Sequence, residues 1–172
     1  MIVVVMGVSG AGKTTIGSAL ADRLGWEFLD ADEFHPAANV AKMAAGTPLA
    51  DSDRWPWLDR LNEELLARET AGASAVLACS ALKEAYRARL MARLRDARLV
   101  YLRGSFEFIE GRIASRRHKY MPASLLQSQF DTLEPPTDSL EIDAALTVPE
   151  AVRRIADELA DELARTGPAR KP

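Results

Sequence analysis

Short apolar runs alternate along this chain with longer segments in which apolar residues recur every three or four positions. The apolar runs predict β-strands at 2–6, 27–32, 74–80, 98–104 and 140–146. The amphipathic segments predict α-helices at about 13–24, 35–46, 55–72, 82–94, 106–117, 122–134 and from 147 onward. This alternation predicts an α/β fold of three layers, in which a parallel sheet of about five strands carries helices on both faces.

Local signals support several of these boundaries. Gly25 follows the first helical segment and Gly46 ends the second, as glycine commonly does at helix C-termini. Pro36 stands at the start of the second segment. Thr147 and Glu150 have the spacing of a capping box and open the last helix.

The stretch "GVSGAGKTT" (7–15) lies between the first strand and the first helix. Gly7, Gly12, Lys13 and Thr14 match the pattern in which glycine-rich backbone N–H groups cradle phosphates and the helix N-terminus adds its dipole. Lys13 would reach the β- and γ-phosphates, and Thr14 would bind Mg²⁺. A glycine-rich turn with a solvated lysine is the alternative. The expected nucleotide-binding residues are Gly7, Val8, Ser9, Gly10, Ala11, Gly12, Lys13, Thr14 and Thr15.

Ligands of such sheets bind beyond the carboxyl ends of the strands. At the end of the second strand, Asp30 and Asp32 are two positions apart, so on an extended chain they project to the same side. Phosphoryl transfer needs one carboxylate near Mg²⁺ and another to orient the acceptor hydroxyl. An Asp-rich turn or a helix cap is the alternative. His35 suits capping or packing better than a catalytic base.

Basic residues also follow strand ends. Arg54 could clamp a carboxylate, and Lys83 and Arg87 form an i, i+4 pair for an anionic acceptor. A solvated helix face is the alternative for that pair.

Cys79 is expected to be a small buried core residue and not a nucleophile. Arg116 belongs to a dense basic stretch at 115–122, which would close over the nucleotide as a lid or else remain a solvated loop.

Composition limits the classes of function. The 172 residues suit one domain over 1–165, followed by a flexible tail at 166–172. The net charge is −3, which gives no basic footprint for nucleic acid. No apolar run approaches the ~20 residues of a membrane span, and the N-terminus lacks the charged leader of a signal peptide. A cytoplasmic protein without membrane or nucleic-acid partners is therefore expected.

These residues together predict a Mg²⁺-dependent kinase of a small, anionic acceptor. Two alternatives stay open. One is a kinase of another acceptor, such as shikimate or a nucleoside monophosphate, although the short lid argues against the latter. The other is a nucleotide-dependent switch. The absence of an Asn-Lys-x-Asp element, which recognises guanine, argues against a guanine-nucleotide switch.

Four stretches resemble the thermoresistant-type gluconokinases over about residues 3–160. They are "VMGVSGAGKTTIGSALA", "FLDADEFHPAANVAKMAAGTPLADSDRWPWL", "CSALKEAYRARL" and "YMPASLLQSQFDTLEPP". The resemblance implies a P-loop kinase fold related to shikimate kinase and the nucleoside monophosphate kinases, with a small lid. It implies transfer of phosphate from ATP, with Mg²⁺, to the 6-hydroxyl of D-gluconate. It also implies a homodimer in the cytoplasm.

The resemblance assigns roles as well. Lys13 and Thr14 would hold ATP and Mg²⁺, Asp30 would organise the metal's water shell, and Asp32 would orient and deprotonate the acceptor. The residues implied to bind gluconate are Asp32, His35, Arg54, Lys83, Arg87 and Gln129, with Gln129 completing the substrate wall or bracing the lid. Arg116 would be the lid arginine. The chain reads "RRHKYMP" where many members have Gly-His-Phe, so His118 and Lys119 are both candidates for the usual lid histidine.

Overall fold

The computed structural model describes residues 1–115 and 123–166. Its strands are β1 (Ile2–Met6), β2 (Glu27–Asp30), β3 (Ala75–Ala78), β4 (Ala97–Arg103) and β5 (Leu140–Asp143). Its α-helices are α1 (Lys13–Leu24), α2 (Ala37–Ala44), α3 (Asp51–Thr70), α4 (Glu84–Leu90), α5 (Phe106–Ala114), α6 (Ala123–Thr132) and α7 (Val148–Thr166). The lid residues Arg116, His118 and Lys119, and the tail from 167, lie outside the described residues.

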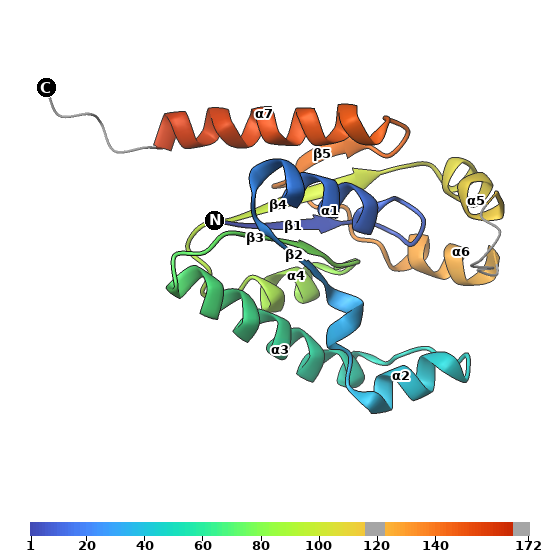
Figure 1. Cartoon of the computed structure of the whole chain (residues 1–172). Helices are drawn as coiled ribbons and strands as arrows, with labels where there is room; N and C mark the ends of the chain where they lie inside the picture. Colours follow the sequence, from blue (N-terminus) through green and yellow to red (C-terminus); the bar gives the residue numbers. More distant parts are fainter. Residues whose placement is uncertain (116–122, 167–172) are drawn as a thin grey trace, which may run out of the picture.

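The five strands form one parallel sheet in the order β2-β3-β1-β4-β5. Helices α1 and α7 cover one face, and α3 and α4 cover the other (Figure 1). This arrangement confirms the three-layer α/β fold expected from the alternation of strands and helices. It also brings the carboxyl ends of β1, β2 and β3 to one edge of the sheet.

The apolar run of β1 supplies both halves of the core. Val3 and Val5 belong to the cluster under α1 and α7, whereas Ile2, Val4 and Met6 belong to the cluster under α3. Successive side chains of a strand point to opposite faces, so a central strand covered on both sides must be apolar throughout. The core therefore anchors the loop that follows β1.

Two predicted boundaries are wrong in a way that affects the site. The second strand ends at Asp30, and Ala31–Phe34 forms a 3₁₀ turn, because the Asp30 carboxylate accepts the Asp32 N–H at 3.1 Å and caps that turn. Helix α3 begins at Asp51 instead of 55. Its first turn is acidic, which suits the helix dipole, and the Asp53 carboxylate accepts the Ala50 N–H at 2.9 Å.

The last helix has the predicted capping box. The Glu150 carboxylate accepts the Thr147 N–H at 3.0 Å, and the Glu150 N–H donates to the Thr147 hydroxyl at 3.4 Å.

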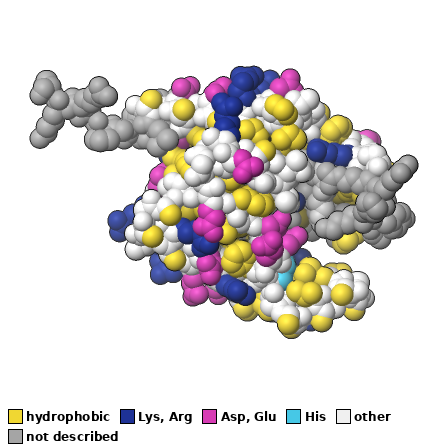
Figure 2. Space-filling view, viewed as in Figure 1, with side chains coloured by type: hydrophobic (Ala, Val, Ile, Leu, Met, Phe, Trp, Pro, Cys, Tyr) yellow, Lys and Arg dark blue, Asp and Glu magenta, His cyan; other side chains and the backbone are white. Residues whose placement is uncertain are grey.

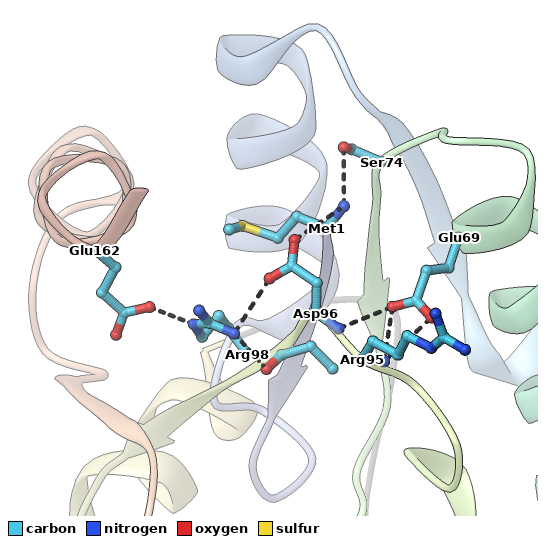
Figure 3. A network of polar contacts seen from close by, with 8 residues as sticks. Met1, Glu69, Ser74, Arg95, Asp96, Arg98 and Glu162 are labelled. Carbon is cyan, nitrogen blue, oxygen red and sulfur yellow. Dashed lines mark hydrogen bonds and ion pairs between the residues drawn. The ribbon is translucent and has the colours of Figure 1, made fainter. Parts of the chain in front are cut away.

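At the amino-terminal end of the sheet, Arg98 of β4 binds Glu162 of α7 and lies 3.3 Å from Asp96 (Figure 3). These contacts fix α7 on the sheet, at the end opposite the predicted ligand site.

Candidate active site

A cavity of about 640 Å³ opens at the carboxyl ends of β1, β2 and β3. Its walls come from the phosphate loop (residues 7–15), the turn after β2, the first turns of α3, the β3–α4 loop (79–83) and α6. Met43 of α2 also lines it, and α2 projects at the lower right of the molecule with hydrophobic side chains on its surface (Figure 2). The location is the one that the sheet topology predicts for a ligand.

The phosphate loop has a backbone that requires glycine. Gly7, Gly10 and Gly12 have φ values of +145°, +88° and +105°, a region that side chains with a Cβ rarely adopt. A Cβ at Gly10 would also come within 2.7 Å of Ile113. Lys13 opens α1 and donates from Nζ to the Val8 carbonyl oxygen at 3.1 Å, so the lysine closes over its own loop.

Six of the nine expected nucleotide-binding residues line the cavity, namely Ser9, Gly10, Gly12, Lys13, Thr14 and Thr15. The other three, Gly7, Val8 and Ala11, are buried and do not line the cavity. The Gly7 N–H donates to the Ser80 carbonyl oxygen at 3.4 Å, which links the loop to the end of β3. Gly7 therefore ties the start of the phosphate loop to the sheet.

Two oxygen-bearing side chains meet beside the loop. The Thr14 hydroxyl donates to an Asp30 carboxylate oxygen at 3.0 Å, and the other Asp30 oxygen accepts the Asp32 N–H. Asp30 and Asp32 both line the cavity. Asp32, however, belongs to the 3₁₀ turn and not to an extended strand, so the expectation that the two carboxylates share one side of a strand is wrong.

Two cations line the cavity, Arg54 of α3 and Lys83 of the β3–α4 loop. Arg54 donates from Nη1 to the Leu49 carbonyl oxygen at 2.7 Å and to the Tyr86 hydroxyl at 3.3 Å. Lys83 Nζ lies 3.1 and 3.0 Å from the two oxygens of Asp51, and the Tyr86 hydroxyl also donates to Asp51. Arg54, Lys83 and Tyr86 line the cavity, and Asp51 does not.

Hydrogen bonding shifts the pKa values in this cluster. The hydrogen bond to Asp51 raises the pKa of Lys83, so this amine stays protonated at neutral pH. The hydrogen bonds from Tyr86 and then Lys83 lower the pKa of Asp51. Sequence reasoning did not identify Asp51 or Tyr86 as part of the site. Since α3 begins before Trp55, Asp51 and Arg54 occupy the first turn of one helix, and that spacing was the available signal.

His35 lies against an aromatic wall of the cavity. Its ring stacks on Trp57 with centroids 4.2 Å apart and planes 14° from parallel. Trp57 in turn donates from Nε1 to the Ala31 carbonyl oxygen at 2.8 Å. Burial lowers the pKa of His35, so its neutral form is favoured. His35 is therefore a packed residue that still reaches the cavity.

Arg87 is not where the acceptor-binding prediction requires it. Its side chain is buried and does not line the cavity. The guanidinium donates to the carbonyl oxygens of Ala81 and Leu82, both at 3.1 Å. Ala81 has a φ of +45°, so Arg87 stabilises a strained turn of the β3–α4 loop.

Cys79 is buried, and burial raises the pKa of its thiol to about 12. Both findings fit the prediction that Cys79 is a buried core residue.

Gln129 of α6 lines the cavity and binds the phosphate loop directly. Its Oε1 accepts the Ser9 N–H at 2.7 Å, and its Nε2 donates to the Ser9 hydroxyl at 3.0 Å. Of the residues expected at the site, Asp30, Asp32, His35, Arg54, Lys83 and Gln129 line one cavity with the phosphate loop. Arg116 lies outside the described residues.

Comparisons with known proteins identify relatives over most of the chain. The model of the AAA domain family matches residues 2–136. The chain is 44% identical to the probable gluconokinase of Xenopus tropicalis, with 96% of this chain and 94% of that protein covered. It is 41% identical to the thermoresistant gluconokinase of Escherichia coli (strain K12), with 83% of each covered. The crystal structure of a gluconokinase from Sinorhizobium meliloti 1021 superposes with a TM-score of 0.81 at 39% identity and covers 93% of this chain and 95% of that one.

Proposed function

The chain belongs to the gluconokinase family, and from that premise we propose that it transfers the γ-phosphoryl group of ATP to the 6-hydroxyl of D-gluconate. The product is 6-phospho-D-gluconate. One observation carries the proposal: the phosphate loop, the cations Arg54 and Lys83, and Asp32 all line a single cavity. A phosphate donor and a carboxylate-bearing acceptor can therefore occupy the same cavity.

Mg²⁺ fits the oxygen donors beside the loop. Thr14 and Asp30 bring a hydroxyl and a carboxylate together at 3.0 Å, and Mg²⁺ in such sites takes one or two protein oxygens plus phosphates and water. Among residues 1–115 and 123–166, no group of three or more His, Cys, Asp or Glu side chains could hold a metal by itself. When bound, Mg²⁺ would neutralise charge on the phosphates; Thr14 and Asp30 would hold it.

The remaining roles follow from chemistry. Lys13 stabilises the charge of the transferred phosphoryl group. Asp32 orients the acceptor hydroxyl and accepts its proton. Arg54 and Lys83 bind the gluconate carboxylate, and His35 and Tyr86 face its hydroxyl groups. Arg116 would complete the nucleotide site from the lid, whose closure would exclude water that competes for the phosphoryl group.

The same two cations suit any small acid, so a kinase of another anionic acceptor such as shikimate is the main alternative. A nucleotide switch without an acceptor is less well supported, because it would give Asp32, Arg54 and Lys83 no substrate to bind.

We also propose a cytoplasmic homodimer. Within the part of the chain that the structure describes, there is no helix with the length and apolarity to cross a membrane.

The deciding experiment measures ADP release from MgATP with D-gluconate, shikimate, other sugar acids and nucleoside monophosphates in parallel. Turnover with gluconate far above the others supports the proposal. Turnover with a different acid instead would keep the phosphoryl chemistry and refute gluconate as the acceptor. ATP hydrolysis unaffected by every acceptor would favour the switch.

A further inference from the structure

Helix α6 is joined to both halves of the active site. At its middle, the Gln129 amide makes two hydrogen bonds to Ser9 of the phosphate loop, 120 positions away in the chain. Just past its end, the Glu134 N–H donates to the Leu82 carbonyl oxygen at 2.9 Å. The Glu134 carboxylate accepts the Glu84 N–H at 2.6 Å, at the N-terminus of α4. Residues 129–134 therefore connect the phosphate loop to the loop that carries Lys83.

The chemistry of the Gln129–Ser9 contact is specific. An amide side chain offers an oxygen that accepts and an NH2 group that donates, and here both bind the same residue. The backbone N–H of Ser9 donates to Gln129, so this side chain occupies one N–H donor of the phosphate loop. Gln129 consequently ties the phosphate loop to α6 through both the oxygen and the NH2 group of its amide.

We propose that Gln129 is a positioning residue that couples the two halves of the site. A nucleotide that orders the phosphate loop would, through Ser9 and Gln129, order α6 and the Glu134 contacts, and so stabilise the β3–α4 loop in its acceptor-binding form. By thermodynamic reciprocity, an acceptor bound at that loop would raise the affinity for nucleotide by the same factor. The inference rests on the proposed function only for the identity of the acceptor.

The helix offers a matched control. Gln127 is exposed, and its amide donates to Asp131 one turn along the same helix at 2.7 Å. Gln129→Met and Gln127→Met therefore make the same chemical change on the same helix. Only the first removes the contact with the phosphate loop. Ser9→Ala is a second, milder variant that removes one of the two hydrogen bonds.

The test is hydrogen–deuterium exchange with and without the Mg²⁺ complex of a non-hydrolysable ATP analogue, followed by calorimetric titration of the analogue with and without D-gluconate. In the wild type and Gln127→Met, we expect the analogue to protect residues 7–15 and also 82–84, and gluconate to raise its affinity about fivefold or more. In Gln129→Met, protection should remain at 7–15 but fall at 82–84, and the affinity ratio should approach one. Ser9→Ala should give protection at 82–84 and an affinity ratio between those of the wild type and Gln129→Met.

Three outcomes would overturn the coupling. Gln129→Met could keep protection at 82–84, Gln127→Met could lose it equally, or the wild type could show none. A fall in thermal stability of Gln129→Met with unchanged coupling would reduce Gln129 to a structural role. If gluconate neither binds nor is phosphorylated, the proposed function fails, and the exchange pattern with the analogue alone still decides this inference.

Discussion

The Thr14 hydroxyl at the start of α1 lies 3.0 Å from a carboxylate oxygen of Asp30 at the end of β2. Strand β3 separates β2 from β1 in the sheet, so the contact does not come from neighbouring strands. The phosphate loop carries the chain from the end of β1 to the start of α1, and this brings Thr14 to Asp30. The pair therefore depends on the whole sheet, and it marks the proposed metal position.

Thr14 should act through its hydroxyl. We expect Thr14→Val to weaken Mg²⁺-ADP binding about tenfold, the effect of losing one interaction of ~1.4 kcal/mol, because valine keeps the shape and removes the oxygen. Thr14→Ser should bind nearly as the wild type does. Calorimetric titrations with Mg²⁺ and with EDTA would test this; an equal loss in both conditions would assign Thr14 to the nucleotide instead of the metal.

Asp32 should be needed for transfer and not for nucleotide binding. Asp32→Asn removes the proton acceptor, so we expect kcat to fall by about 10² to 10⁴ while the Kd of MgATP changes little. Glu33→Gln is the matched control, because Glu33 is an exposed carboxylate in the same 3₁₀ turn. Lost ATP binding with retained turnover in Asp32→Asn would disprove the assignment.

Lys83 should serve the acceptor. A charge-assisted hydrogen bond contributes about 1.5–3 kcal/mol, so Lys83→Met should raise the acceptor KM roughly 10- to 100-fold and leave the KM of ATP much less affected. Arg89→Met is a suitable control, since Arg89 lies on α4, pairs with Asp59 and does not line the cavity. A larger change in the KM of ATP than in that of the acceptor would move Lys83 to the nucleotide side.

Arg87 should act on stability. Arg87→Met would leave the carbonyl oxygens of Ala81 and Leu82 without this donor in a buried site. We expect the free energy of unfolding to fall by about 1–3 kcal/mol, measured by urea denaturation. An acceptor KM raised as far as in Lys83→Met, with stability unchanged, would restore the direct binding role that the sequence suggested.

His35 should make stability depend on pH. Burial lowers its pKa below the usual 6.5, so the folded state favours the neutral ring and protonation favours the unfolded state. The unfolding free energy should therefore keep the full His35 contribution above about pH 6.5 and lose it as the pH falls further. Urea denaturation of wild type and His35→Gln from pH 5 to 8 would show this as a difference that shrinks below pH 6.5. A constant difference, or one that grows, would contradict it.

Much of the molecule could be predicted from local sequence. The alternation of apolar runs and amphipathic segments predicted the strands and helices, because each has its own periodicity and both faces of this sheet are covered. The phosphate loop could be recognised because its glycines, Lys13 and Thr14 are needed at fixed spacing for reasons within the loop itself. The capping box at Thr147 was likewise a local feature, and it is confirmed.

The placement of side chains between elements was decided only by the tertiary structure. Arg87 has the same local spacing from Lys83 whether it faces the cavity or the core, and only packing turned it toward Ala81 and Leu82. Asp51 meets Lys83 across 32 positions, and Gln129 meets Ser9 across 120. By itself the sequence determined the strand and helix segments and the phosphate loop, because those depend on near neighbours. The order of the strands and the distant side chains that share the cavity depend on how the layers pack and orient α3, α4 and α6.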